Sequence, residues 1–199
     1  EGYHAHFSQK MYDQIKDYYN IQEDLNVYTK NFFKKVDNIG SSHEKKYEYL
    51  NQLALVIVSE LIIVQDMSDE MKDIVYEPIR VMFKNHIIDE SFHANYFKTF
   101  FQIIWPQLSE KEKEIMGLSL CESIAVLGEP RVSIYYYSLS RLGFTDDFIS
   151  QCIKDIYDTD EWKLNKIKRR MTQTFKLLHS CGVFEIPSVN KEFKNKGFI

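Results

Sequence analysis

The stretch HIIDESFH, residues 86–93, places two imidazoles and two carboxylates within a region rich in Phe, Tyr, Ile and Leu. On a helix with 100° per residue, His86, Glu90 and His93 fall within about 60° of one another. Phe97 lies near the same side, so these polar groups continue an apolar side that faces a core. Buried ionisable groups require a partner or a bound cation. The stretch alone is compatible with a metal site, a salt-bridged cluster or a solvated helix face.

Apolar residues recur every three or four positions along almost the whole chain, and alternating strand-like runs are scarce. The pattern predicts an all-α protein. HIIDESFH falls on a long helix that begins near Pro78, and Ser109 with Glu112 forms a capping box before another helix. The predicted helices cover residues 1–22, 44–66, 69–76, 78–104, 109–127, 130–142 and 145–178, and a non-helical end starts at Gly182. No linker or repeat divides the chain, so we expect a single domain over residues 1–199.

Composition and charge argue against several classes of function. The net charge is −4 with acidic and basic residues interleaved, which disfavours nucleic acid and anionic membranes as partners. The longest apolar run, LALVIVSELIIV (53–64), is too short to span a bilayer and contains Glu60, and no signal peptide opens the chain. Cys121, Cys152 and Cys181 are widely spaced, as in proteins of a reducing compartment, so we expect a cytoplasmic protein.

Glu60 is a further polar residue that the pattern directs toward a core. Ile57 and Val64 lie on the same helical side as its carboxylate, so the carboxylate points where the helix packs. Glutamate is almost never fully buried without a partner. The alternative interpretation is a glutamate at the edge of the helix that reaches solvent.

The opening residues EGYH repeat the spacing of the end of HIIDESFH. Glu1 and His4 are three residues apart, as are Glu90 and His93, although either pair alone can arise by chance. Helical bundles that bind two metals use a Glu from each of two helices and a Glu-x-x-His from each of the other two. With Glu60, the chain supplies three of those four helices.

In these residues the sequence resembles the p-aminobenzoate N-oxygenase (AurF-type) di-iron oxygenases, a branch of the ferritin-like superfamily. That family carries a third histidine four residues before the last ligand Glu, in an HxxDExxH string that HIIDESFH matches. The resemblance implies a ferritin-like helical bundle with additional C-terminal helices. The ligands it implies are Glu1, His4, Glu60, His86, Glu90 and His93. It also implies that Asp89 accepts a hydrogen bond from a ligand histidine and orients it.

The chain departs from the family pattern at two places. The seventh ligand, a Glu of the first bundle helix, would lie upstream of Glu1, so we expect the given sequence to begin inside the natural protein. Phe92 stands where the family string usually has an Arg, which affects a neighbouring ion pair and leaves the ligand set intact.

Mixed carboxylate and imidazole ligation suits iron or manganese better than a closed zinc site. We therefore expect two iron ions, with manganese as the alternative, and dioxygen as co-substrate. The expected reaction is oxidation of a small organic molecule, an amine taken toward hydroxylamine or nitro, with electrons from an external donor. The metal ligands would be the only catalytic groups. An aromatic-rich helical surface further suggests a homodimer.

For the substrate pocket the sequence offers Tyr136 and Arg169. Tyr136 lies in a run of three tyrosines that cannot all face inward on a helix, and Arg169 lies in a basic turn suited to a substrate carboxylate. Ordinary packing and a solvated helix face are the alternatives. Three other functions stay open for the chain as a whole: a ferritin-like ferroxidase or iron-binding protein, a radical-generating subunit, and a metal-free helical interaction protein.

Overall fold

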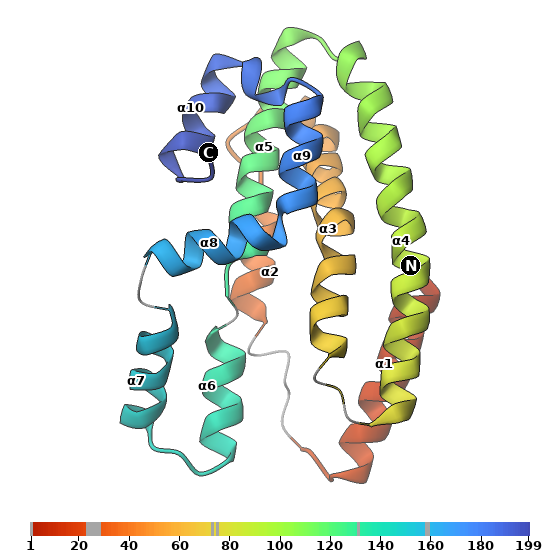
Figure 1. Cartoon of the computed structure of the whole chain (residues 1–199), viewed down its shortest axis with the longest axis vertical. Coiled ribbons are helices and arrows are strands. Elements are labelled where there is room, and N and C mark those ends of the chain that lie inside the picture. The colour runs from red at the N-terminus through yellow and green to blue at the C-terminus, as the bar shows by residue number, and fades with distance from the viewer. Residues whose placement is uncertain (1, 23–28, 73, 75, 131, 158–159) are drawn as a thin grey trace. The chain divides into compact units, whose positions relative to one another are not determined.

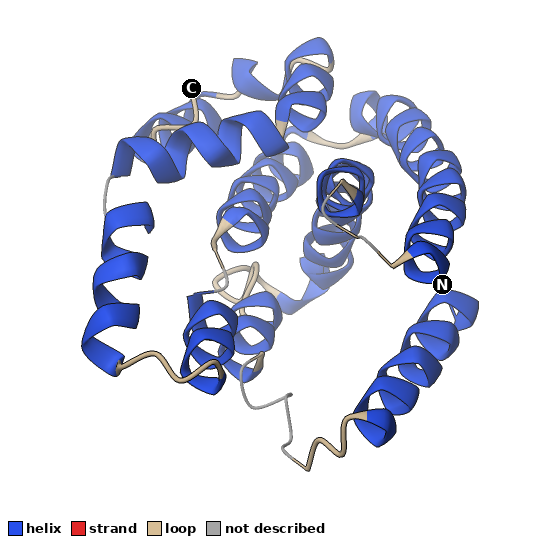
Figure 2. Cartoon of the chain, turned by 60° about the horizontal axis from the view of Figure 1, so that its bottom comes forward, coloured by secondary structure: helices blue, strands red, loops and turns tan. Residues whose placement is uncertain are grey.

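The computed structural model describes residues 2–22, 29–72, 74, 76–130, 132–157 and 160–199. The chain divides into two compact units, Glu1–Lys30 and Asn31–Ile199, each of which is described by itself. Within the described residues every regular element is a helix, which confirms the all-α prediction (Figure 2). The expectation of a single domain over residues 1–199 stays a prediction.

The smaller unit contains one helix, α1 (Gly2–Tyr18), that has no buried residue. It ends two residues before Asn20, which adopts a positive φ of 50°. Such a left-handed residue ends a helix and is tolerated by asparagine. The predicted helix over residues 1–22 is therefore present but shorter.

The larger unit is arranged around α3 (Glu48–Met71), which lies between α4 (Glu77–Ile104) and α5 (Glu110–Gly128) (Figure 1). Ala54, Ile57 and Val58 of α3 are completely buried, because neighbouring helices cover more than one side of it. The shorter helices are α2 (Lys30–Asp37), α6 (Val132–Arg141), α7 (Asp146–Tyr157), α8 (Asp160–Arg170), α9 (Thr172–Ser180) and α10 (Pro187–Asn195). Of these, α8 and α9 contact α3, α10 contacts α5, and α6 packs against α7.

The range Lys45–Asp69, which contains most of α3, is long and apolar enough to cross a membrane by length and composition alone. The core helix of a globular protein passes the same test, and α3 packs between two other helices of its unit. Its apolar run 53–64 is therefore explained by burial on several sides.

A buried polar network joins the loop after α2 to α3 and α5. The Asn51 amide donates to the carbonyl of Gly40 (3.1 Å), and the Ser119 hydroxyl donates to the Asn51 side-chain oxygen (2.7 Å). The Gly40 amide in turn donates to the Glu122 carboxylate (2.7 Å). Gly40 has a φ of 69°, and an added Cβ would lie 2.1 Å from Asn51, so only glycine fits this position.

Several predicted boundaries are confirmed. Helix α4 begins at Glu77 with Pro78 in its first turn, and α5 follows the capping box of Ser109 and Glu112, which is formed. The separate helix predicted over residues 69–76 is wrong, because α3 continues to Met71. Met67 is still buried near the end of α3, so packing extends the helix beyond the predicted boundary.

The C-terminal third of the chain differs most from the prediction. The single helix predicted over residues 145–178 is instead α7, α8 and α9, since a straight helix could not bring Ile149, Ile167 and Leu178 into the interior together. The end predicted to be non-helical contains α10, whose Val189 and Phe193 are fully buried. Their i, i+4 spacing is the helical signal in that segment.

Gly117 of α5 is the point of closest approach between α5 and α10. A Cβ at this position would lie 2.6 Å from a γ-carbon of the fully buried Val189. We expect Gly117→Ala to lower the free energy of unfolding by about 1–2 kcal/mol, because overpacking outweighs the better helix propensity of alanine. Urea unfolding measures the change.

The matched control is the double variant Gly117→Ala with Val189→Ala, which removes the γ-carbons that the new methyl group would meet. We expect its loss of stability to be smaller than the sum of the two single losses. Strict additivity would contradict the close contact.

Candidate metal centre

Helix α4 brings His86, Glu90 and His93 together along one side. One oxygen of the Glu90 carboxylate lies 2.8 Å from Nε2 of His86, and the other lies 3.1 Å from Nδ1 of His93. The spacings i, i+4 and i, i+3 on a regular helix produce this arrangement without any distortion of the backbone. Glu90 is 1% exposed, so its carboxylate is held between two imidazoles in the interior of the unit.

Glu60 approaches the same group from α3. Its carboxylate oxygen Oε2 lies 3.8 Å from Nδ1 of His93. Glu60, Glu90 and His93 each offer one ligand atom, and these three atoms all lie within 4.8 Å of one another. We call Glu60, His86, Glu90 and His93 the α3–α4 cluster.

The surroundings of the α3–α4 cluster are apolar. Ile57 and Leu61, close to Glu60 on α3, are buried. Two carboxylates brought this close in an interior repel each other unless positive charge lies between them. A divalent cation would satisfy both carboxylates, with the imidazoles as further ligands.

The donor set of this cluster fits iron or manganese. Two carboxylates and two imidazoles are borderline-hard oxygen and nitrogen donors, and no thiolate belongs to the cluster. Glu60, His86, Glu90 and His93 would hold the metal. All four were proposed from the sequence, and the structure brings them together, while their binding of metal stays a prediction.

Two other predicted ligands belong to the part of the chain before Lys30. His4 is on α1, in the unit that is described by itself, and Glu1 is outside the described residues. Asp89, expected to orient a ligand histidine, lies on α4 beside Glu90 with an exposed side chain. That orienting role also stays a prediction.

Tyr136 and Arg169, the predicted pocket residues, belong to different parts of the larger unit. The Tyr136 hydroxyl on α6 is hydrogen-bonded to Asp146 at the start of α7, which raises the pKa of that phenol. Arg169 on α8 lines a pocket of about 760 Å³, together with Tyr135, the neighbour of Tyr136. Tyr136 itself is not among the lining residues.

This pocket and the α3–α4 cluster lie on different sides of α3. Asp66 and Asp69 line the pocket, and they follow Glu60 by six and nine residues, so their side chains point about 120–180° away from that of Glu60. The sequence offered Arg169 as a pocket residue but contained no sign that the pocket would open away from the proposed ligands.

Arg170 closes one wall of the same pocket. Its guanidinium forms a two-pronged ion pair with Asp66, with Nε donating to Oδ1 at 2.8 Å. It also donates to the carbonyls of Leu127 (3.4 Å) and Gly128 (3.3 Å), at the end of α5. These contacts provide hydrogen-bond donors for carbonyls at the C-terminal end of α5, and the ion pair links α8 to α3. Sequence reasoning missed this pair because its members are 104 residues apart.

The sequence matches a family model over most of its length. Residues 1–182 match the family described as p-aminobenzoate N-oxygenase AurF. The matched range contains all of the predicted ligands and ends before α10. No curated protein and no solved structure gives a significant match.

The α3–α4 cluster leads to a direct test of metal binding. We expect Glu90→Gln to reduce iron content after anaerobic reconstitution at least about tenfold, because the amide lacks the charge that binds the cation and holds both imidazoles. Elemental analysis per chain gives the readout.

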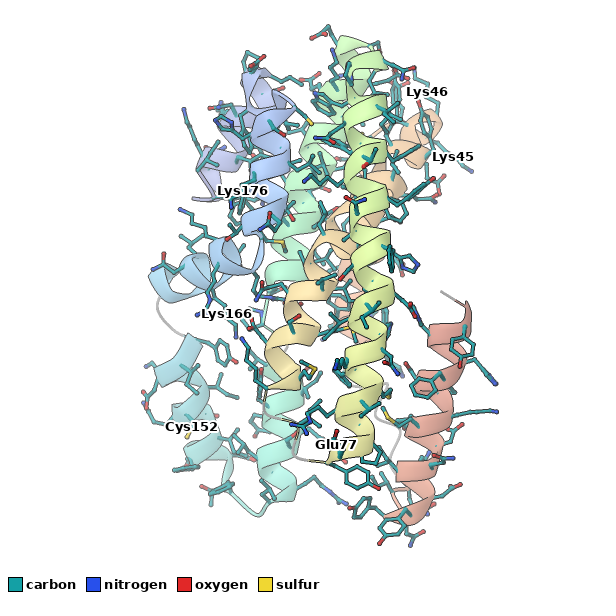
Figure 3. The ribbon with its side chains drawn as sticks, turned by 45° about the vertical axis from the view of Figure 1, so that its right-hand side comes forward. Lys45, Lys46, Glu77, Cys152, Lys166 and Lys176 are labelled. Atoms are coloured by element: carbon teal, nitrogen blue, oxygen red, sulfur yellow. The ribbon has the colours of Figure 1, made fainter. Side chains whose placement is uncertain are left out.

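Glu77→Gln is the matched control, on the same helix. Glu77 is exposed at the start of α4, where it pairs with Arg80 at 2.8 Å (Figure 3). Its substitution should leave the iron content unchanged. Equal losses in the two variants would mean that the cluster is not the metal site.

Proposed function

Because the chain belongs to the p-aminobenzoate N-oxygenase (AurF) family, we propose that it is a di-iron oxygenase that oxidises the nitrogen of a small amine. The supporting observation is the Glu90 carboxylate, buried between His86 and His93 with Glu60 beside it. Membership of this family makes the chain an oxidoreductase of a di-iron class. The amine substrate and the use of iron belong to the proposal.

Bound iron would transfer electrons to dioxygen and thereby reduce it. In the first turnover, one oxygen atom is inserted into an N–H bond to form the hydroxylamine, and the other is released as water. The balance requires two electrons and two protons, which an external reductase or reduced carrier supplies. Further oxidation leads toward the nitro compound.

The residues of this chain hold the centre and isolate it from water. Glu90 places both imidazoles, since each of its oxygens contacts one ring. Packing between α3 and α4 brings Glu60 to the same point, and Ile57, three residues before Glu60, is completely buried. A substrate amine would enter from the less covered side of His93, which is 35% exposed.

Aryl amines that carry a carboxylate are the first substrates to test, because the family description names p-aminobenzoate. The free thiols of Cys121, Cys152 and Cys181 support a reducing compartment for the enzyme. An external electron donor in that compartment is part of the proposal.

Activity is tested with the natural protein, ferrous iron, a chemical reductant, dioxygen and a panel of aryl amines. We expect products heavier by one oxygen atom, and with ¹⁸O₂ the label should appear in the product. Mass spectrometry provides the readout. Rapid oxidation of ferrous iron with growth of a mineral core, and no amine product, would instead identify a ferroxidase.

A matched pair of variants on α3 separates a role of the cluster from an effect on the helix. We expect Glu60→Gln to lower turnover more than about tenfold. Even the replacement of a residue that only hydrogen-bonds to a metal ligand typically lowers metal affinity or activity by about 10–100-fold. Asp69→Asn, on the same helix and paired with Lys72, should retain turnover. Equal activity in both variants would contradict the assignment of Glu60.

A further inference from the structure

The pocket beside Arg169 is a second candidate site, separate from the α3–α4 cluster. Its volume of about 760 Å³ is within the range of about 300–1,000 Å³ that is typical of small-molecule sites. Helices α3, α5, α6 and α8 and the turn after α5 all contribute to its lining. In the view of Figure 1, α8 lies above α6 and α7. Segments that are distant in sequence thus converge on one cavity.

The wall of the pocket between α5 and α8 is closely packed. A Cβ added at Gly128 would lie 2.8 Å from Cγ1 of Ile167, so α8 leaves no room for a side chain at this position. Arg170 donates to the carbonyls of Leu127 and Gly128 at the end of α5. It also pairs with Asp66 of α3. This wall is therefore formed before any ligand binds, which lowers the cost of binding.

Every carboxylate in the lining already has a cationic partner. The ion pairs are Asp66 with Arg170, Asp69 with Lys72, and Glu129 with Lys35. Both oxygens of Asp69 accept hydrogen bonds, one from Lys72 (2.6 Å) and one from Gln65 (2.8 Å), and these bonds lower the pKa of Asp69. The negative groups of the pocket are thus occupied by the protein itself, and the lining does not favour a cationic ligand.

Arg169 is a cation of the lining with no such local partner. Among the residues that the structure describes, its guanidinium forms no hydrogen bond and no ion pair, and it acts on Asp69 only through its charge. The lining contains three cations and three carboxylates, and the partners Lys35 and Lys72 bring the cations to five. The excess of positive charge attracts an anion to the pocket.

Tyr157 of α7 positions two further groups of the pocket. Its ring lies 5.8 Å from the ring of Tyr135, and a hydrogen bond joins the two side chains. The ammonium of Lys166, which Figure 3 labels on α8, lies 5.8 Å from the centre of the same Tyr157 ring. Tyr135 is therefore held near the cations of α8, although 47% of its surface is exposed.

The pocket also presents apolar surface beside its cations. Ile134 is 38% exposed, and the ring of Tyr135 offers a flat face to a ligand. A ligand with an apolar body would remove this surface from water, whereas an inorganic anion would leave it hydrated. The lining therefore fits an anion that carries a flat, apolar body.

We propose that this pocket binds a small organic anion, whose carboxylate or phosphoryl head pairs with Arg169 and whose flat apolar body lies against Ile134 and Tyr135. The planar guanidinium can donate two parallel hydrogen bonds to either head group. The binding requires no metal and is independent of the reaction at the α3–α4 cluster, since the pocket opens on another side of α3.

The first experiment measures the binding of phenyl phosphate and of benzoate to the full chain by calorimetry. We expect the tighter of these probes to bind at least about tenfold more tightly than inorganic phosphate and than phenol, because each of those lacks one half of the ligand. The head group of the tighter probe identifies the class of anion. No detectable binding of either probe, or equal binding of inorganic phosphate, would overturn the proposal.

A charge-matched pair of variants on α8 tests the position of the head group. We expect Arg169→Gln to weaken binding of the tighter probe at least about tenfold, because hydrogen bonds to a charged group are lost. Lys168→Gln is the control, since Lys168 is the neighbouring residue and does not belong to the lining. It should leave the affinity unchanged. Equal losses in the two variants would indicate general attraction to a basic helix and would overturn the assignment.

Ile134→Asn tests the position of the apolar body. We expect it to weaken binding of the tighter probe, whereas Leu142→Asn, at a residue that is 74% exposed and outside the lining, should not. Retained affinity in Ile134→Asn would contradict the proposed orientation.

Iron separates this pocket from the metal centre. The wild type should bind the probe equally before and after anaerobic reconstitution with iron, because the pocket uses no metal. Binding that appears only with iron would place the anion at the metal centre and overturn the proposal.

Discussion

The Glu90 carboxylate, shared between the imidazoles of His86 and His93, is the interaction on which the arrangement of the larger unit depends. A carboxylate that is 1% exposed is costly to bury unless its charge is matched, and a cation bound beside the two rings and Glu60 would match it. Its position also requires α3 and α4 to pack closely, because Glu60 comes from α3. The polar centre and the packing of these two helices are therefore coupled.

Helix α3 shows how a single helix serves two different sites. One of its sides carries Glu60 toward α4, and another carries Asp66 to the ion pair with Arg170 at the end of α5. Between Glu60 and Asp66, Leu61 and Ile62 are buried. The result is a sequence that is apolar enough to resemble a membrane span, although neighbouring helices provide its apolar surroundings.

Helix α4 likewise has two faces with separate roles. Its inner face carries His86, Glu90 and His93, and its outer face carries exposed apolar side chains, among them Ile88 and Phe92. The helical period that aligns His86, Glu90 and His93 on the inner face also aligns the exposed apolar side chains on the opposite face. A replacement on one face therefore need not disturb the other.

Local sequence patterns are sufficient to predict the all-α class, the family, and the grouping of His86, Glu90 and His93, because helical periodicity and short motifs depend on residues close together in the chain. They also indicated that Glu60 faces a core. The three-dimensional packing was needed to establish that Glu60 lies beside His93, that the single helix predicted over residues 145–178 is divided into three, and that the pocket lined by Arg169 opens away from the cluster. These features depend on contacts between segments that are distant in sequence, and on how much of each helix its neighbours cover. Local sequence patterns contain no information on either.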